Sequence, residues 1–525
     1  MRLPCDEAAI RSGAGAVPCK PSSAPWILAA AILGSSMAFI DSTVVNVALP
    51  ALQSTLGATV VDVQWVIEAY GLFLGALILA GGSIGDLLGR RRVYIAGVAV
   101  FAIASAWCGL ATNILELIVA RAVQGVGAAF LVPGSLAIIS SSFREEERGR
   151  AIGTWSGFTS ITTAIGPVLG GWLIEHASWR WAFFLNLPLA AAVIVISIWH
   201  VPESQSKRAT QVDWNGALLA TAGLGAWVYG LVESASLGWK NPLIYSSLIL
   251  GGACLLAFPF VEAREATPMM PLTLFKSGTF SGANLLTFFL YAAFGVFFFV
   301  FPLNLIQVQG YSATATGAAA LPLILLMFFL SRWSGGLITR YGARPPLIFG
   351  PIIAAVGFLL FAMPAVGGSY WSTFFPAFLV LGLGMAITVA PLTAVVMGAV
   401  DQDLAGTASG INNAVARVAS LLAVAVIGVA LVAAFRYRLD AEIAKVPMTA
   451  AIRQQIEANS IQLAAMTVPT ELNEDTRSLT SFSIRTSFIF AFRVVMAICA
   501  VLSLVSAAFA WWRIPAREPS GAPPQ

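Results

Sequence analysis

The sequence predicts an all-α membrane protein with fourteen transmembrane helices, arranged as two six-helix bundles with two helices inserted between them. Three observations predict this fold class: an apolar composition, recurring apolar runs of helix length, and a pattern that repeats between the two halves of the chain. Of the 525 residues, 58% are hydrophobic and only 10% are charged, and the mean hydropathy is +0.84. Soluble domains carry about a quarter charged residues, so this composition indicates a protein embedded in a lipid bilayer.

The apolar runs predict where the chain crosses the membrane. A bilayer core about 30 Å thick requires roughly 20 apolar residues per helix. Runs of that length lie near 26–50, 63–83, 93–112, 114–138, 149–174, 181–201, 214–234, 242–262, 280–304, 314–334, 346–366, 371–397, 404–433 and 486–511. The first run is too long for a cleavable signal peptide, so we expect it to remain as a helix.

These runs also predict the organisation of the chain. The expected parts are a tail at 1–25, a first bundle at 26–201, inserted helices with linkers at 202–279, a second bundle at 280–511 and a tail at 512–525. The polar segment 434–485 contains an amphipathic stretch near Ala441–Ala464. We expect it to form an extracytoplasmic hairpin or short helix.

Lysine and arginine predict the orientation, because short cytoplasmic loops are enriched in both. With the N-terminus inside, the short cytoplasmic segments hold 17 of these residues, and the short outer loops hold only Arg180 and Lys240. An even number of spans then places both termini in the cytoplasm. The net charge of +4 does not indicate a nucleic-acid partner, because no basic run exceeds the three arginines at 90–92.

A repeat relates the two halves. Gly82, Gly89 and Arg91 recur 253 residues later as Gly335, Gly342 and Arg344. The same offset relates the segment Gly153–Gly157 to Gly406–Gly410. Parallel repeats of this kind build transporters whose substrate site lies between the halves.

Catalytic and metal chemistry are not indicated. The five cysteines fit neither a zinc site nor a disulfide framework, and the only histidines are His176 and His200. The sequence contains no phosphate-binding loop and no recognisable catalytic set. We therefore expect no enzyme activity and no cofactor, with a proton gradient as the source of energy.

Six motifs point to a known family. They are Asp41-Ser-Thr-Val-Val-Asn-Val-Ala-Leu-Pro50, Gly82-xxx-Asp86-xx-Gly89-Arg90-Arg91, Arg121-xx-Gln124-Gly125-x-Gly127, Gly166-Pro167-xx-Gly170-Gly171, Trp179-Arg180-Trp181-xxxx-Asn186-x-Pro188 and Asp213-Trp214-x-Gly216. In this order they resemble the major facilitator superfamily, and within it the fourteen-helix drug:proton antiporters of the EmrB/QacA type. The resemblance covers the chain from Trp26 to Trp512.

The resemblance implies a monomeric exporter of small amphipathic or cationic compounds in the bacterial inner membrane. Such a multidrug-efflux antiporter would exchange its substrate for H⁺ by alternating access. Two alternatives stay open: an importer of the same fold, and a membrane sensor or assembly protein that binds a ligand without transporting it.

Buried charges are the candidates for proton coupling, because a charge inside hydrocarbon costs at least ~2.5 kcal/mol. We expect Asp41, Glu68 and Arg121 to share one layer of the first bundle, about 13, 8 and 10 Å from the outer helix ends. Burial disfavours a charged carboxyl and a nearby guanidinium favours it. Asp41 is thus predicted to carry the proton, Arg121 to bias it, and Glu68 to act as a second carboxylate or cation-recognising group. The alternative is an Asp41–Arg121 pair that only fixes helix packing.

The cytoplasmic motif is a candidate gate, formed by Gly82, Asp86, Gly89, Arg90 and Arg91. Glycines permit a tight turn, and Asp86 is expected to pair with an arginine across the halves and hold the outward-facing state. The alternative is a basic membrane anchor with turn glycines.

The fifth predicted helix carries Gly157, Gly166, Pro167, Gly170 and Gly171. Small residues let helices approach closely and a proline bends the axis. We expect this helix to seal against a helix of the other half, with generic glycine packing as the alternative.

Polar side chains within the spans are candidates for a substrate cavity: Asn46, Gln124, Asn412, Asn413 and Arg417. The phenylalanines of the run 280–304 could stack on flat cations, and the alternative is that they face lipid.

Overall fold

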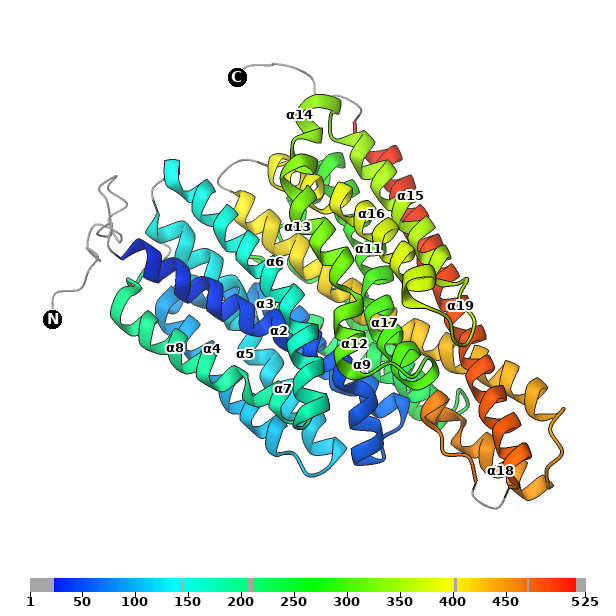
Figure 1. Ribbon diagram of the computed structural model, residues 1–525. Coiled ribbons are helices and arrows are strands. Elements are labelled where there is room, and N and C mark those ends of the chain that lie inside the picture. Colours follow the sequence, from blue (N-terminus) through cyan, green and yellow to red (C-terminus); the bar gives the residue numbers. More distant parts are fainter. Residues whose placement is uncertain (1–22, 144, 206–210, 401–403, 470–471, 516–525) are drawn as a thin grey trace. The chain divides into compact units, whose positions relative to one another are not determined.

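A computed structural model describes residues 23–143, 145–205, 211–400, 404–469 and 472–515, and every regular element within these ranges is helical (Figure 1). The first half forms α2 (Ala24–Leu56), α3 (Val60–Leu88), α4 (Arg90–Leu110), α5 (Ile114–Ser142), α6 (Glu145–His176), α7 (Trp181–Phe184) and α8 (Asn186–His200). Next come α9 (Trp214–Leu237), α10 (Pro242–Glu262) and a 3₁₀ turn at Leu272–Lys276.

The second half begins with α11 (Gly278–Leu303) and a π-helical turn (Asn304–Val308). It continues with α12 (Ala313–Ala319), α13 (Leu321–Gly335), α14 (Leu337–Tyr341), α15 (Arg344–Phe361), α16 (Tyr370–Gly398), α17 (Ala405–Ile443), α18 (Ala450–Ala458), a 3₁₀ turn (Asn459–Ala465) and α19 (Glu474–Arg513). Most of the predicted terminal tails lies outside the described residues.

Thirteen of the described segments are long and apolar enough to cross a membrane, and each matches a predicted run. The all-helical membrane class is therefore confirmed. The remaining predicted run, 149–174, lies in α6, which has 32 residues but is not among the thirteen. Its first six residues are mostly charged, and glycine, serine and threonine are frequent in the rest. The length of α6 suffices for a span, but its composition is more polar than that of the others.

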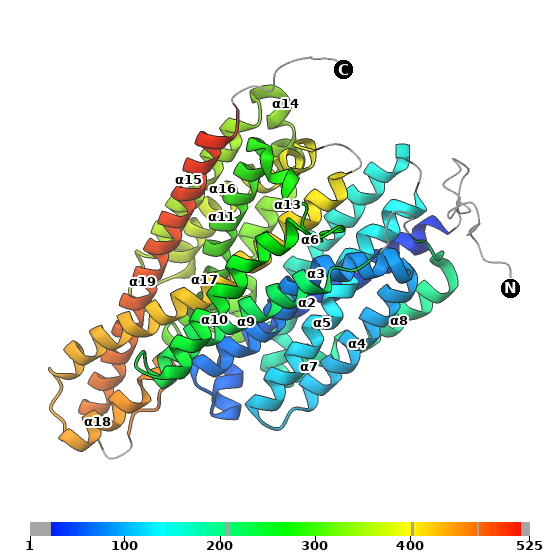
Figure 2. The ribbon, with the colours of Figure 1, turned by 180° about the vertical axis from the view of Figure 1, so that it is seen from behind.

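Several helices extend beyond their predicted ends. α2 continues through Pro50 to Leu56. α17 and α19 have 39 and 40 residues and enter the segment predicted as a loop at 434–485. The connection between them is therefore only 444–473, and it contains α18, which lies at one end of α17 and α19 in Figures 1 and 2. The predicted boundaries of this loop, 434 and 485, were therefore wrong at both ends. Hydropathy indicates where a helix leaves the bilayer, but the helix itself can continue into water.

The chain divides into two compact units. The first comprises the residues up to Ala48, Trp65–Trp227 and Ser247–Leu272, and the second comprises Leu49–Gln64, Val228–Ser246 and the chain from Thr273 onward. The connection between α2 and α3 therefore belongs to the second unit. There the side-chain amide of Gln64 donates to the carbonyl of Val424 at 3.0 Å.

Within each unit, one helix pair packs through a glycine. A Cβ atom on Gly127 of α5 would lie 2.5 Å from the backbone nitrogen of Phe101 on α4. A Cβ atom on Gly384 of α16 would lie 2.5 Å from the backbone nitrogen of Ala354 on α15. Phe101 and Ala354 are 253 residues apart and the two glycines are 257 residues apart, so an equivalent contact recurs close to the offset found in the sequence.

The same offset relates two helix junctions. Gly89 separates α3 from α4 with φ of +112°, and Gly342 separates α14 from α15 with φ of +82°. Both values lie in a region that residues with a Cβ atom rarely adopt. The repeated glycines thus place the start of α4 and of α15 after equivalent turns.

Candidate functional site

Asp41 and Arg121 form a buried ion pair in the first unit. Asp41 on α2 is 0% exposed and Arg121 on α5 is 1% exposed. Arg121 Nη1 lies 2.5 Å from Asp41 Oδ2. Asp41 is 15 residues from the end of α2 at Leu56, or about 22 Å, instead of the predicted 13 Å. The predicted distance was too short because the prediction ended the helix at Pro50.

Two further side chains hold the carboxylate of Asp41. Gln124 Nε2 donates to Asp41 Oδ1 at 2.8 Å, and Asn186 Nδ2 donates to the same oxygen at 3.2 Å. Arg121 Nη1 also donates to Gln124 Oε1 at 2.6 Å. A buried charge is tolerated when it is both paired and hydrogen-bonded, and these contacts meet both conditions. Sequence analysis had quoted Asn186 only as part of a motif.

α3 fixes the position of the guanidinium. Arg121 Nε donates to the carbonyl of Val66 at 3.0 Å, and the guanidinium lies over the ring of Tyr70, 4.2 Å from its centroid. α5 approaches α3 closely at Gly125, where a Cβ atom would lie 2.5 Å from the carbonyl oxygen of Tyr70. A carbonyl and an aromatic face both attract a cation, so Arg121 has partners besides Asp41.

Glu68 lies outside this network. Val66 and Tyr70 are four residues apart and share a face of α3, whereas Glu68 lies two residues from each and therefore on another face. Its side chain is only 1% exposed, and neither carboxylate oxygen has a hydrogen-bond partner among the described residues. Glu68 lies about 12 Å from the start of α3, so it shares a depth with Arg121. It does not join the Asp41–Arg121 ion pair, and its role as a second carboxylate or cation-recognising group stays a prediction.

The predicted gate is arranged differently from expectation. Asp86 pairs with Arg90, with Arg90 Nη2 and Nε at 2.7 and 2.8 Å from Asp86 Oδ1. This partner comes from the adjacent turn of the same unit, whereas the prediction named an arginine of the other half. Gly82 lies inside α3, so only Gly89 forms the turn.

Sequence analysis missed Glu203, the buried anion at this turn. Its side chain is 2% exposed, and Oε1 accepts a hydrogen bond from the backbone nitrogen of Arg91 at 3.1 Å. Oε2 lies 3.8 Å from Arg91 Nε and 3.6 Å from Arg92 Nε. A Cβ atom on Gly89 would lie 2.7 Å from Glu203 Oε1. The available signal was an acidic residue directly after the sixth predicted span, which resembled an ordinary linker charge.

The glycines of α6 pack against α2. A Cβ atom on Gly170 would lie 2.5 Å from Val44 Cγ1, and one on Gly166 would contact the hydroxyl of Thr43. Both contacts lie within the first unit, and a seal against a helix of the other half stays a prediction. Pro167 and Gly171 are also buried, while the surroundings of Gly157 lie outside the described residues.

The predicted cavity residues of the first unit have local partners. Asn46 donates to the carbonyl of Ser42 on its own helix at 3.0 Å, and Gln124 belongs to the network around Asp41. Gln124 is fully buried. Because Gln124 is buried and donates to Asp41, it does not line an open cavity in this structure.

The cavity residues of the second unit lie on α17. Asn412 Nδ2 donates to Thr287 Oγ1 at 2.7 Å and to Asn284 Oδ1 at 3.1 Å, which ties α17 to α11. Asn413 is exposed and Arg417 is half-buried.

The phenylalanines at the centre of α11 form core contacts. Phe297 is fully buried, and its ring centroid lies 4.7 Å from that of Phe361 and 5.0 Å from that of Phe301. Phe361 also contacts Phe378 at 4.9 Å. These rings stabilise the second unit and are not available to a ligand.

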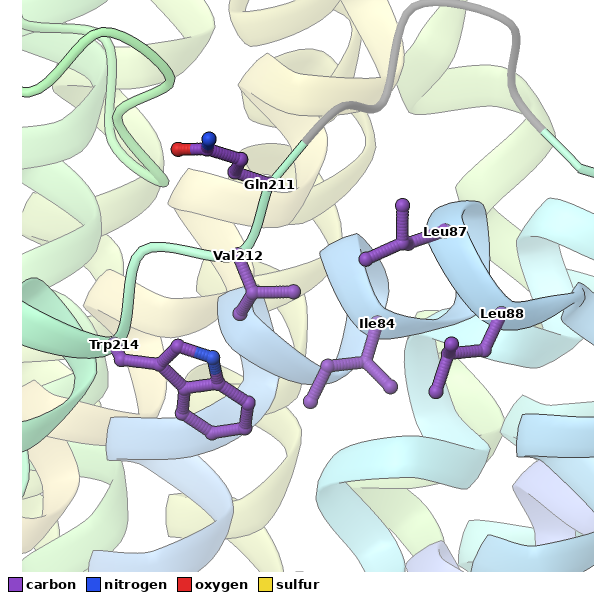
Figure 3. A pocket seen from close by; sticks show the side chains of 6 residues that line it. All are labelled: Ile84, Leu87, Leu88, Gln211, Val212 and Trp214. Atoms are coloured by element: carbon purple, nitrogen blue, oxygen red, sulfur yellow. The ribbon is translucent and has the colours of Figure 1, made fainter.

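A shallow hollow of about 500 Å³ lies between the end of α3 and the segment that leads into α9. Figure 3 shows the side chains that line it: Ile84, Leu87, Leu88, Gln211, Val212 and Trp214. It contains none of the predicted cavity residues. In the part of the chain that the structure describes, no three His, Cys, Asp or Glu side chains lie close enough together to hold a metal ion.

Comparison with known proteins supports the fold and identifies the family. A family model for the Major Facilitator Superfamily matches residues 31–424. The chain is 36% identical over 409 residues to the multidrug resistance protein Stp of Mycobacterium tuberculosis (strain CDC 1551 / Oshkosh), covering 76% of this chain and 74% of that protein. It is 32% identical over 414 residues to the tetracenomycin C resistance and export protein of Streptomyces glaucescens, covering 77% and 76%. The crystal structure of a bacterial homolog of the human lysosomal transporter Spinster shares the fold, with a TM-score of 0.63 over 96% of this chain and 100% of that chain, at 16% identity.

Proposed function

This chain belongs to the Major Facilitator Superfamily of multi-pass membrane transporters, and from that premise we propose that it exports small amphipathic or cationic compounds in exchange for protons. It is a transporter and not an enzyme. The direction of transport is supported by relatives that are named for drug resistance and export. The proposed location is the bacterial inner membrane, with both termini in the cytoplasm and the monomer as the working unit.

The observation that carries proton coupling is the buried pair of Asp41 and Arg121. When Asp41 accepts a proton, its charge disappears and so does most of its attraction for Arg121. Arg121 keeps Val66, Gln124 and the ring of Tyr70 as partners. Arg121 can therefore separate from Asp41 while its guanidinium keeps other polar and aromatic partners. Proton uptake from outside and release to the cytoplasm would then alternate between an open and a closed pair.

Glu68 is the candidate for recognising the substrate's charge. It is buried on a different face of α3 from Arg121's partners, and its carboxylate has no hydrogen-bond partner in the described chain. A buried carboxylate without a partner is costly, and a cationic substrate or a proton would relieve that cost. We propose that Asn46, Asn412, Asn413 and Arg417 contact the substrate at other stages of the cycle.

The segment around Gly89 is proposed to control access on the cytoplasmic side. Glu203 joins the end of α8 to the start of α4 through Arg91 and Arg92. The ion pair between Asp86 and Arg90 connects the two helices on either side of the same turn. A movement of α8 would therefore be transmitted to α4.

A direct test compares cells with and without the protein, loaded with a panel of toxic amphipathic dyes. We expect expressing cells to accumulate less of a cationic dye, and a protonophore to abolish the difference. Greater accumulation in expressing cells would indicate import. A difference that persists with the protonophore would contradict proton coupling.

A further inference from the structure

Asn186 occupies a special place in the network around Asp41. It is the first residue of α8, directly after Leu185, the helical residue that joins α7 to α8, and its side chain is 0% exposed. Nδ2 donates to Asp41 Oδ1 at 3.2 Å and to Ser105 Oγ at 3.0 Å. Its other polar atom, Oδ1, is buried and has no hydrogen-bond partner in the described chain.

Ser105 on α4 determines which way this amide points. Its hydroxyl donates its only hydrogen to the carbonyl of Phe183 at 2.8 Å, so Ser105 Oγ can only accept from Asn186. The amide therefore presents Nδ2 to both neighbours. This arrangement suits an ionised Asp41, which accepts hydrogen bonds from Arg121, Gln124 and Asn186. It leaves Oδ1 buried and unsatisfied, which is unfavourable.

A protonated Asp41 requires a hydrogen-bond acceptor as a neighbour, whereas an ionised Asp41 requires donors. Its carboxylic acid carries one O–H group that requires an acceptor. Gln124 Oε1 already accepts from Arg121, whereas Asn186 Oδ1 has no partner. Rotation of the Asn186 amide by roughly 180° would place Oδ1 where Nδ2 now lies. Oδ1 has two lone pairs and could then accept from both Asp41 and Ser105, while Nδ2 moves to the buried position that Oδ1 now occupies.

We propose that Asn186 is a positioning residue that reverses its amide when Asp41 gains a proton, and so transmits the protonation of Asp41 to the junction of α7 and α8. In the reversed state the Ser105 hydroxyl turns from the carbonyl of Phe183 to Asn186 Oδ1. Phe183 belongs to α7, which ends at Phe184. The proton on Asp41 of α2 thereby releases the hydrogen bond between Ser105 and Phe183 near the junction of α7 and α8. This inference rests on the proposed role of Asp41.

Infrared difference spectroscopy on the reconstituted protein, with isotope-labelled asparagine side-chain amides, tests the reversal. The wild type should show an asparagine amide band that changes between high and low pH. The change should vanish in Asn186→Leu and in Asp41→Asn. It should persist in Asn284→Leu, which removes a buried asparagine of the second unit. A pH-independent band in the wild type, or an undiminished change in Asn186→Leu, would overturn the inference.

Ser105→Ala tests transmission by removing the link between Asn186 and the carbonyl of Phe183, while Asp41 remains as the partner that orients the Asn186 amide. The amide band should still respond to pH, while the maximal rate of proton-driven export falls about tenfold with KM unchanged within about twofold. A wild-type export rate in this variant would contradict transmission through Ser105. If a pH gradient drives export but the wild-type band is silent, the inference on Asn186 fails and proton coupling stands. If the band responds but no gradient drives export, the proposed function fails instead.

Discussion

At the scale of the residue, Asp41 shows how a bundle of membrane helices can hold a carboxyl group near the middle of a helix. It accepts hydrogen bonds from three side chains, and one of these donors is a cation. Removing one member of a buried ion pair destabilises the protein, because the remaining charge then lies in the interior without a partner. This reasoning predicts the effects of substitutions at Arg121 and, by contrast, at Glu68.

We expect Arg121→Ala to lower the free energy of unfolding by about 3–5 kcal/mol, because Asp41 is left buried without its cation. The double variant Arg121→Ala with Asp41→Asn should recover most of that loss. Unfolding of the purified protein in detergent provides the measurement. If the double variant is as unstable as Arg121→Ala alone, the ion pair is not what Arg121 stabilises.

We expect Glu68→Gln to reduce the export of a cationic substrate about tenfold, equivalent to about 1.4 kcal/mol, and to change the export of a neutral substrate of similar shape less than about twofold. The reason is that Glu68 lies apart from the Asp41 network and offers an unpaired acceptor. Initial rates of export of the two compounds are compared. Glu457→Gln on exposed α18 is the matched control. An equal loss of export rate for both compounds would contradict a role in recognising charge and would indicate that Glu68 acts in proton coupling or in folding.

The residues around Asp41 also show what can be predicted from sequence. The motifs identified Asp41, Arg121 and Gln124, because buried charges and amides in apolar runs need partners. Glu203 could not be found in that way, because its burial arises from the packing of the end of α8 against the start of α4. The unpartnered oxygen of Asn186 is likewise visible only once α2, α4 and α8 are placed together.

At the scale of the element, the turn between α3 and α4 combines a positive-φ backbone conformation with a buried anion. Gly89 adopts φ of +112°, and the carboxylate of Glu203 occupies the space that a side chain would need. Backbone conformation and packing therefore require glycine for independent reasons.

We expect Gly89→Ala to destabilise the protein by about 1–3 kcal/mol through backbone strain and to slow transport, because the Cβ atom would displace Glu203 from Arg91. Gly85→Ala is the control, since a Cβ atom there meets no atom within 4 Å. Thermal unfolding and export rates are measured for both variants. Equal behaviour of the two variants would show that the turn tolerates a side chain.

Element boundaries illustrate a second limit of prediction from sequence. Apolar length predicted thirteen spans correctly because hydrophobic transfer determines where a chain can cross the bilayer. It did not predict that α2 continues past Pro50 or that α17 and α19 extend beyond the apolar runs. Helices continue wherever backbone hydrogen bonding and packing allow, and hydropathy does not report either.

At the scale of the whole molecule, the repeat at an offset of 253 residues appears as matching structure in each unit. The glycine turn and the glycine contact of the α4–α5 pair recur in the second unit. Such repeats are the basis of alternating access in transporters of this kind. The orientation of the chain in the membrane is a separate prediction, which follows from lysine and arginine.

We expect a cysteine placed at Lys445, between α17 and α18, to react with a membrane-impermeant maleimide added to right-side-out vesicles. A cysteine at Arg92 should react only in inverted vesicles. Both side chains are well exposed, at 66% and 74%, so reactivity reports the side of the membrane. The variants are made in a protein whose native cysteines are replaced by serine. The reverse labelling pattern would contradict the proposed orientation.

The central claim is that a proton on Asp41 drives export, and it is tested in inverted vesicles that contain the purified protein. An imposed pH gradient, acidic inside the vesicle, should drive a cationic dye inward in the wild type. In Asp41→Asn the dye should move only down its own gradient, because residue 41 can no longer take up and release a proton. Gradient-driven accumulation at the wild-type rate in Asp41→Asn would contradict the account.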